Sequence, residues 1–352
     1  MTILVGWNNF LFRLCIINIL ITGGCGFIGS ALIRLLSKET DCSILNIDKL
    51  SYAANHNAVE PFVNKDKYKF IKKDICSLDL LQIFEDFKPQ IVMNLAAESH
   101  VDRSIESPGA FIQSNIIGTY NLLETSRSYY KNATDLIKNK FRFIHISTDE
   151  VFGSLGDSGF FEESTAYDPS SPYSASKASS DHLVRAWHRT YGLPAIITNC
   201  SNNYGPYQFP EKIIPLMINN AINHEPLTIY GDGLQIRDWL YVDDHVKALY
   251  LIATNGSIGE TYNIGGRNEK TNIDVVNSIC KILDKTLPSK QIRTYSELIT
   301  YVQDRPGHDR RYAINANKIQ NMLGWSPAET FETGIAKTIN WYLNNSVKLA
   351  KR

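Results

Sequence analysis

The sequence lacks the charge pattern that marks proteins of nucleic acids and membrane surfaces. Its 352 residues carry 36 basic and 36 acidic side chains, and no cluster of Lys and Arg stands out. Nucleic acid and anionic membranes both select concentrated positive charge, so neither is expected as a main partner. Internal repeats and low-complexity segments are also missing. The length predicts one large domain or two modest ones with a sizeable core.

Motifs of disulfide and metal chemistry are missing as well. The six cysteines are scattered without a CxxC pair, and the eight histidines show no HExxH or similar spacing. Disulfide-rich and zinc-binding proteins depend on such spacings. We therefore expect no metal, and reduced thiols in a cytoplasmic protein.

The N-terminus has no uninterrupted apolar run. Residues 3–21 are rich in apolar side chains, but three asparagines and Arg13 interrupt them. A signal peptide or membrane anchor needs a basic start and a continuous apolar segment. We expect residues 16–21 to form the first buried strand and residues 1–15 to be an N-terminal extension.

A glycine-rich loop follows this strand. Gly23, Gly26 and Gly29 have the spacing GxxGxxG, and a helical segment starts after them. Glycines at such points permit a tight turn, let backbone N–H groups approach a pyrophosphate, and allow the helix to lie close to the strand. A glycine triad by itself can mark only a tight turn, so its context has to decide.

That context is a second predicted strand, at residues 43–47, which ends at Asp48. Asp48 lies nineteen residues past Gly29. A carboxylate at this place can accept the hydroxyls of an adenosine ribose and disfavours a 2′-phosphate. The pattern favours NAD over NADP, although Asp48 could also be a strand-end acid without such a role.

Two further strands end near residues suited to the same cofactor. Residues 68–71 lead to Asp74 and Ile75, which are placed to border an adenine. Residues 91–95 lead to two alanines, and small side chains let a flat cofactor pass close to the backbone.

Predicted helices, at residues 78–87 and 111–130, separate these strands. Alternating strands and helices predict an α/β fold with a doubly wound parallel sheet of Rossmann type. Ligands bind such sheets at the carboxyl ends of the strands.

The residues with the most distinctive chemistry lie between positions 147 and 177. An apolar strand, residues 141–146, is followed by Thr148, Asp149 and Glu150, while Tyr173 and Lys177 are four residues apart. One helical turn separates the last two, so both can face one pocket, and a nearby cation lowers the pKa of a phenol. The set offers a base for an alcohol and an acid/base pair for a second proton, which exceeds the needs of hydride transfer. The two carboxylates could instead cap a helix or form ion pairs.

The composition changes after residue 200, where Pro206, Pro210 and Pro215 occur within ten residues of one another. We expect an NAD-binding Rossmann domain at residues 16–200, with a later return near residues 236–264. Residues 201–345 are expected to form a smaller substrate-binding region.

Taken together, these motifs resemble those of nucleotide-sugar 4,6-dehydratases, which are extended short-chain dehydrogenase/reductases. The resemblance covers about residues 17–342, and its most specific part is Thr-Asp-Glu placed before Tyr-x-x-x-Lys. The chain departs from the pattern by its N-terminal extension and by Cys25 and Phe152 within familiar motifs. The resemblance implies a smaller C-terminal α/β region that binds a nucleotide sugar.

The resemblance also implies a lyase mechanism. Tyr173, aided by Lys177 and oriented with Thr148, removes the proton of the sugar 4-hydroxyl while hydride passes from C4 to NAD. Glu150 then removes the C5 proton, and Asp149 protonates the departing 6-hydroxyl. Return of the hydride to C6 gives a 4-keto-6-deoxy sugar for deoxysugar biosynthesis, expected to be of the rhamnose type.

Contacts are implied residue by residue. The catalytic set is Thr148, Asp149, Glu150, Tyr173 and Lys177. Implied NAD contacts, besides Tyr173 and Lys177, are Gly23, Gly26, Phe27, Ile28, Gly29, Asp48, Lys49, Leu50, Ser51, Asp74, Ile75, Leu95, Ala96, Ala97, Ser99, Ser114 and Asn203. Implied substrate contacts are His100, Thr148, Asn202, Lys212, Arg237, Asn272, Arg305, His308 and Tyr312. A guanidinium can bind phosphate oxygens in pairs, which suits the two arginines.

Alternatives stay open at this point. A nucleotide-sugar 4-epimerase shares the fold and the Tyr/Lys pair but needs no second acid/base pair, and a binding protein without catalysis need not keep the set together. A UDP-glucose 4,6-dehydratase shares every catalytic residue. Overall likeness favours dTDP-glucose, but thymine and uracil differ by one methyl, a contact worth about 1–3 kcal/mol. The resemblance further implies a homodimer joined through the helices at residues 111–130 and 178–191.

Overall fold

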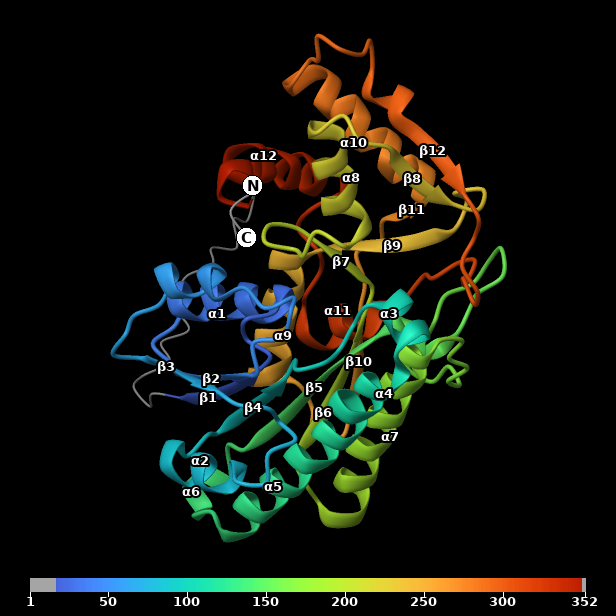
Figure 1. The fold of residues 1–352 in the computed structure, drawn as a ribbon. Helices are drawn as coiled ribbons and strands as arrows, with labels where there is room; N and C mark the ends of the chain where they lie inside the picture. The colour runs from blue at the N-terminus through green and yellow to red at the C-terminus, as the bar shows by residue number, and fades with distance from the viewer. Residues whose placement is uncertain (1–16, 350–352) are drawn as a thin grey trace, which may run out of the picture.

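A seven-stranded parallel sheet forms the centre of the protein (Figure 1). The computed structural model describes residues 17–349. The strand order is β10-β6-β5-β4-β1-β2-β3. The strands are β1 (Asn18–Thr22), β2 (Ser43–Asp48), β3 (Tyr68–Lys72), β4 (Ile91–Asn94), β5 (Arg142–Thr148), β6 (Ala195–Cys200) and β10 (Thr261–Ile264). The chain leaves β1 toward β2 on one side and returns to β4 on the other, so the topology switches at β1.

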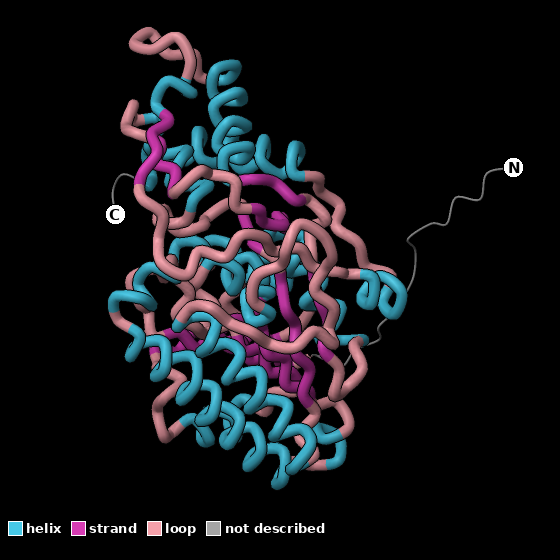
Figure 2. The backbone as a smooth tube through the Cα atoms, turned by 90° about the vertical axis from the view of Figure 1, so that its right-hand side faces the viewer, coloured by secondary structure: helices cyan, strands magenta, loops and turns pink. Residues whose placement is uncertain are grey.

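Helices cover both faces of this sheet (Figures 1 and 2). Alternate residues of a strand point to opposite faces, and in β1 Ile19 and Ile21 join one hydrophobic cluster while Leu20 joins the other. The first cluster includes α1 (Phe27–Glu39) and α9 (Val242–Asn255). The second includes α2 (Leu80–Phe87), α5 (Gly118–Asn132) and α7 (Pro172–Tyr191). The predicted doubly wound parallel fold is confirmed.

A smaller unit lies beyond the carboxyl edge of the sheet. It holds a three-stranded sheet of β7 (Asn202–Tyr204), β9 (Ile236–Tyr241) and β11 (Glu269–Thr271), and a parallel pair, β8 (Leu227–Tyr230) with β12 (Ile299–Val302). Its helices α8 (Ile213–Ile222), α10 (Asn272–Thr286) and α12 (Phe331–Leu349) share a separate hydrophobic cluster. Between β9 and β11 the chain rejoins the large sheet through α9 and β10.

The helix predicted at residues 111–130 differs from expectation. It starts as α4 (Pro108–Phe111), passes through the π-helical turn η3 (Ile112–Ile117) and continues as α5. The π turn places Asn115 so that its amide bonds both the backbone N–H (2.8 Å) and the carbonyl (3.0 Å) of Glu98. Hydrophobic periodicity cannot predict this, because the wider turn is stabilised by a contact distant in sequence.

Short elements complete the fold. They are α3 (Val101–Glu106), α6 (Asp135–Lys138), α11 (Asn317–Leu323) and the single 3-10 turns η1 (His56–Ala58), η2 (Glu60–Phe62), η4 (Asp149–Phe152) and η5 (Tyr295–Leu298). Within residues 17–349, no helix has the length and apolarity needed to cross a membrane. The same residues contain no group of three or more His, Cys, Asp or Glu side chains arranged for a metal. The N-terminal extension expected at residues 1–15 lies outside the described residues.

Candidate active site

A cavity of about 280 Å³ lies at the carboxyl edge of the parallel sheet. The loops after β1, β2 and β4 line one side of it. The ends of β5 and β6, with residues 201–212 of the smaller unit, line the other. The cavity therefore opens at the point where the strand order reverses, which is where open α/β sheets bind ligands.

The glycine loop is shaped by close backbone contacts. Gly23 has a φ of 70°, and a Cβ there would lie 2.7 Å from the Cα of Ala96. At Gly29 a Cβ would come within 2.3 Å of the carbonyl oxygen of Gly23. Both positions therefore require glycine, and the loop brings the N-terminus of α1 to the cavity, where its free N–H groups can meet a phosphate.

Asp48, at the end of β2, forms hydrogen bonds with the glycine loop and with the loop that follows β2. One carboxylate oxygen accepts the N–H of Cys25 at 2.9 Å, and the other accepts the N–H of Leu50 at 2.7 Å. Burial raises the pKa of Asp48, and these two hydrogen bonds act against the rise. The carboxylate still faces the cavity, as a ribose contact requires. Leu50 itself has a φ of 56° and contributes to this turn rather than to the cavity wall.

The cavity gathers nearly all the residues predicted to contact a cofactor. Those that line it are Gly23, Gly26, Phe27, Ile28, Gly29, Asp48, Lys49, Ser51, Asp74, Ile75, Leu95, Ala96, Ala97, Ser99, Ser114, Tyr173, Lys177 and Asn203. Lys49 also bonds Ser114 at 2.8 Å and pairs with Glu98 at 3.0 Å, which links the loop after β2 to the π turn.

Four of the predicted catalytic residues, Thr148, Glu150, Tyr173 and Lys177, line the cavity, whereas Asp149 is buried and is not among its lining residues. β5 ends at Thr148, and the turn η4 then places Asp149 and Glu150 directly beside it. The Thr148 hydroxyl accepts the N–H of Glu150 and contacts a carboxylate oxygen of Asp149, each at 3.3 Å. Tyr173 and Lys177 face the same cavity from the first two turns of α7.

Local sequence explains why α7 begins where it does. Ser171 and Ser174 form a capping box, with each serine hydroxyl accepting a backbone N–H of the other residue at 3.0 Å. Pro172 occupies the first helical position, where no N–H is needed. The helix start is thus fixed just before Tyr173, and the phenol is held in the first turn.

The two adjacent carboxyl groups have different electrostatic surroundings. Burial, reinforced by the charges of Glu150 and Asp238, raises the pKa of Asp149 well above its ordinary value. Burial also raises the pKa of Glu150, but the charges of Lys212, Arg237 and Arg305 favour its ionised form. Surroundings that push the pKa values of two carboxyl groups apart suit one group as a proton donor, here Asp149, and the other as a base, here Glu150.

One electrostatic expectation is wrong for this structure. The neighbouring cation was expected to lower the pKa of Tyr173, yet burial, followed by the charge of Glu150, raises it well above its ordinary value. Lys177 donates from Nζ to the carbonyl oxygen of Ile146 at 2.8 Å. Spacing along a helix predicts that two side chains share a pocket, but it does not weigh burial against charge.

Three of the residues predicted to contact the substrate are cations, and among these three only Lys212 lines the cavity. Lys212 lines the cavity and donates to the carbonyl oxygen of Ser99 at 2.8 Å. The Arg237 guanidinium lies 4.1 Å from the ring centroid of Tyr312. Arg305 pairs with Asp102 at 2.9 Å. All three charges act on Glu150, so these residues converge from distant parts of the chain.

Of the other predicted substrate residues, His100, Asn272 and His308 do not line the cavity. Thr148 and Asn202 line the cavity. His100 caps α3 and lies 3.9 Å from Glu211, whereas His308 bonds Asp304 at 2.6 Å. Asn272 starts α10 and donates its backbone N–H to the carbonyl oxygen of Gln235, whose side-chain amide in turn donates to Asp304.

Sequence reasoning missed a contact that bridges the cavity mouth. Glu211, from the smaller unit, accepts the Tyr52 hydroxyl at 2.8 Å and the Nε–H of Arg103 at 3.2 Å. The Arg103 guanidinium also lies 3.7 Å from the centroid of the Tyr52 ring. Nothing in the sequence pairs these three positions, although Glu211 stands next to a predicted substrate residue.

Comparison with known proteins identifies the family. The model of the family described as GDP-mannose 4,6 dehydratase matches residues 20–338. This chain belongs to that family. The dTDP-glucose 4,6-dehydratase of Salmonella typhimurium is 59% identical over 339 residues, which cover 94% of this chain and 93% of that relative.

Solved structures of the family share the fold. The dTDP-glucose 4,6-dehydratase of Bacillus anthracis, in complex with NAD, is 45% identical with a TM-score of 0.82, covering 94% of this chain and 98% of its own. DesIV, the dTDP-glucose 4,6-dehydratase of Streptomyces venezuelae, also solved with NAD, is 39% identical with a TM-score of 0.85 and the same coverage of both chains. These similarities extend over both units of the molecule.

Proposed function

We propose that this protein is a hydro-lyase that converts dTDP-glucose to dTDP-4-keto-6-deoxyglucose with NAD as its cofactor. The observation that carries the proposal is the adjacent pair Asp149, which is buried, and Glu150, which lines the same cavity as Tyr173. A dehydrogenase or epimerase needs the tyrosine but has no use for a second acid and base. The high identity to dehydratases supports the same choice.

The residues of the cavity fit NAD. The N-terminus of α1 and the close approach of the glycine loop suit a pyrophosphate, and Asp48 suits an unphosphorylated ribose. Bound NAD would accept the C4 hydride and return it to C6. The side chains of the cavity then have to move protons and hold the sugar.

We propose one residue for each proton step. We assign removal of the O4 proton to Tyr173, with the Thr148 hydroxyl orienting the same oxygen. Glu150 takes the C5 proton once a ketone at C4 has made it acidic, and its three neighbouring cations favour the ionised form that this requires. Asp149 gives its proton to O6 as water leaves, which its raised pKa favours.

The cations and aromatic residues at the outer end of the site suit the diphosphate. We propose that Lys212, Arg237 and Arg305 bind its oxygens, with Tyr312 supporting Arg237 through ring contact. His100, Asn202, Asn272 and His308 are proposed to complete the substrate contacts. In this scheme residues 16–200 chiefly hold NAD and residues 201–345 chiefly hold the nucleotide sugar.

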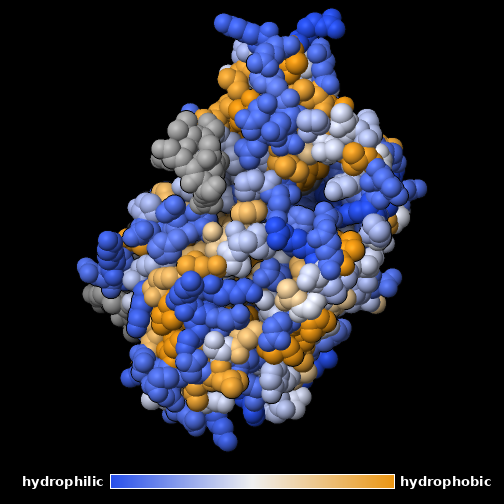
Figure 3. Space-filling model, viewed as in Figure 1, coloured by the Kyte–Doolittle hydropathy of each residue, from blue (hydrophilic) through white to orange (hydrophobic). Residues whose placement is uncertain are grey.

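We also propose a homodimer in the cytoplasm. The face made by η3, α5 and α7 exposes large apolar side chains: Ile112 (51%), Ile117 (42%), Tyr120 (46%) and Tyr191 (50%). Figure 3 shows hydrophobic patches over the half of the molecule where Figure 1 places these helices. A second copy packing its own helices on this face would cover them.

Product analysis tests the activity. Purified protein with NAD and dTDP-glucose should give a product lighter by one water, with no build-up of free NADH, because the hydride returns to the sugar. A product of unchanged mass would indicate an epimerase. Faster turnover of UDP-glucose would keep the dehydratase chemistry but change the base that the site prefers.

A further inference from the structure

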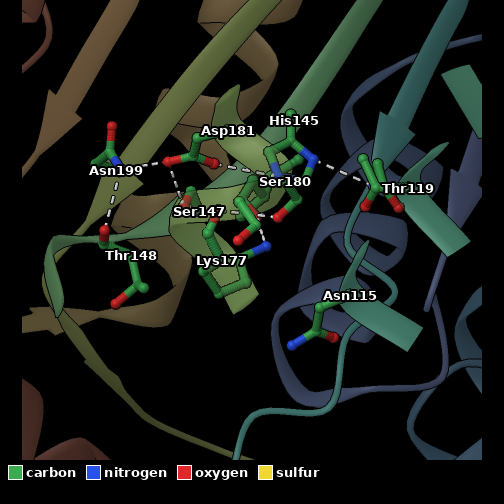
Figure 4. A network of polar contacts seen from close by, with 12 residues as sticks. Asn115, Thr119, His145, Ser147, Thr148, Lys177, Ser180, Asp181 and Asn199 are labelled. Atoms are coloured by element: carbon green, nitrogen blue, oxygen red, sulfur yellow. Dashed lines mark hydrogen bonds and ion pairs between the residues drawn. The ribbon is translucent and has the colours of Figure 1, made fainter. Parts of the chain in front are cut away.

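A buried polar network lies behind the catalytic residues (Figure 4). Its centre is Asp181, one helical turn beyond Lys177 on α7 and fully buried at 0% exposure. One of its oxygens accepts the hydroxyls of Ser147 at 2.9 Å and Tyr167 at 2.8 Å. Burying a carboxylate this completely costs free energy unless hydrogen bonds or opposite charges compensate for the lost water.

The same oxygen connects Asp181 to the end of β5. It receives the Asn199 amide at 3.3 Å, and that amide also donates to the backbone carbonyl of Thr148 at 3.0 Å. Ser147, the residue before Thr148, is bonded to Asp181 directly. Asp181 thus fixes the strand terminus that presents Thr148, Asp149 and Glu150 to the cavity.

The other oxygen faces His145. The imidazole Nε2 lies 3.3 Å away, and both atoms are otherwise without a hydrogen-bond partner in the described chain. Asn94 accepts the Thr22 hydroxyl on its oxygen, so its amide nitrogen must donate to Nδ1 of His145 at 3.2 Å. This leaves the histidine proton on Nε2, directed at Asp181.

The charges of these groups can be assigned. Burial lowers the pKa of His145 to about 4, so the ring is neutral at neutral pH. Burial alone would raise the pKa of Asp181, but its contacts with His145, Lys177 and Tyr167 outweigh burial and bring it below its ordinary value. Asp181 is therefore an anion in the interior.

Among charged groups, Asp181 has the largest effect on the pKa of Lys177. Burial lowers the pKa of Lys177, while the charge of Asp181, followed by that of Cys200, acts to raise it. The Cys200 thiol has its pKa raised to about 12, mainly by burial, and stays neutral at working pH. Tyr173 is not among the charges that act on Lys177. The ionised carboxylate of Asp181 is therefore the negative charge that balances the ammonium of Lys177.

We propose that Asp181 is a positioning residue with two effects: its charge keeps Lys177 cationic, and its bonds to Ser147 and Asn199 hold Thr148 in place. Asp181 does not line the cavity. The inference rests on the proposed function for its kinetic consequences, but the charge state of Lys177 can be measured without turnover.

The test compares three variants. D181N removes the charge at nearly constant volume, N199A keeps the charge but cuts the link to Thr148, and S180A removes a neighbouring buried hydroxyl that bonds only carbonyls of its own helix. The pKa of Lys177 is read from the pH dependence of its reductive methylation by mass spectrometry. kcat and KM for dTDP-glucose are measured in parallel over pH.

D181N should lower the methylation pKa of Lys177 by roughly half a unit or more, and the alkaline limb of kcat should move down with it. Its kcat should fall about tenfold or more with KM nearly unchanged. N199A should reduce kcat without moving the Lys177 pKa, and S180A should change neither.

Unchanged values in D181N would overturn the proposal. Even if D181N did not fold, N199A with wild-type kcat would overturn the second effect, the positioning of Thr148 through Asn199. A wild-type protein inactive on dTDP-glucose would refute the proposed function alone, because the methylation result would still decide whether Asp181 sets the charge of Lys177.

Discussion

At the scale of single residues, Asp149 and Glu150 show how position changes chemistry. They are neighbours on one turn, yet Asp149 lies beside further negative charge and Glu150 lies among three cations. A protonated acid and an ionised base can therefore coexist one residue apart. Two predictions follow from this contrast, one kinetic and one thermodynamic.

Replacing Glu150 with Gln should stop elimination while sparing oxidation at C4. Without a base at C5 the ketone intermediate cannot lose its proton, so reduced nicotinamide should accumulate and dehydration should fall about 100-fold or more. Near-ultraviolet absorbance and product mass check this. E225Q, at an exposed position, is the control and should behave as wild type. Dehydration by E150Q at the normal rate would remove Glu150 from the mechanism.

Replacing Asp149 with Asn should inactivate the enzyme but stabilise the fold. A carboxyl whose pKa is raised on folding, here mainly by burial, contributes stability at low pH that is lost as pH rises. The amide of D149N cannot ionise, so the stability of this variant does not fall with pH in this way. The Tm of D149N should exceed that of wild type by about 1–4 °C near neutral pH, and the difference should disappear in acid. Exposed D157N should leave Tm unchanged. A lower Tm for D149N at every pH would contradict the burial argument.

Sequence reasoning was effective for residues whose roles follow local spacing. The glycine loop, the strand-end Asp48 and the helical pair Tyr173 and Lys177 all reached one cavity. It failed where the outcome depends on surroundings distant in sequence, as with the raised pKa of Tyr173. Asp181 carried a signal, its spacing from Lys177, but only the fold shows that His145 and Asn199 enclose it.

At the scale of elements, three segments meet at Glu211, which lines the cavity. The loop after β2 supplies Tyr52, α3 supplies Arg103, and the segment before α8 supplies Glu211, which bonds both. We call this arrangement of Tyr52, Arg103 and Glu211 the clasp; in it, the Glu211 carboxylate links the loop after β2 and helix α3 to the smaller unit. A cofactor regenerated in every turnover benefits from such retention.

Replacing Glu211 with Gln should loosen the clasp. Loss of the charge removes the ion pair with Arg103 and weakens the bond from Tyr52, so NAD should dissociate roughly fivefold faster or more. Stopped-flow chase of bound NAD measures this directly. E332Q, which breaks an ion pair with Lys270 away from the cavity, is the matched control. Equal release rates in both variants would mean that the clasp does not retain the cofactor.

Element boundaries were predictable where capping or turn residues mark them. α7 ends at Tyr191, as expected, because Gly192 adopts the left-handed conformation that ends helices. The π turn η3 was not predictable, since its stabilising bonds reach Glu98 and Ser176. Pairing of β9 with β7 and with β11 in a separate sheet was likewise beyond local patterns, because the strands are short and far apart in sequence.

At the scale of the whole molecule, the apolar face on η3, α5 and α7 should join two copies. We expect the wild-type protein to sediment as a dimer, and I117E to shift it toward monomer with affinity reduced about tenfold or more. M322E, equally exposed but on α11, is the control and should stay dimeric. A monomeric wild type, or a dimer unaffected by I117E, would place the interface elsewhere or remove it.

The most direct test of the account is NMR of the product formed in D2O, with dTDP-glucose in one sample and UDP-glucose in another. The mechanism exchanges the C5 proton with solvent and moves the C4 hydrogen to C6 as hydride. The account predicts a 4-keto-6-deoxy product that carries deuterium at C5, formed faster from dTDP-glucose. A galactose product, or a product without deuterium at C5, would contradict the roles assigned to Asp149 and Glu150.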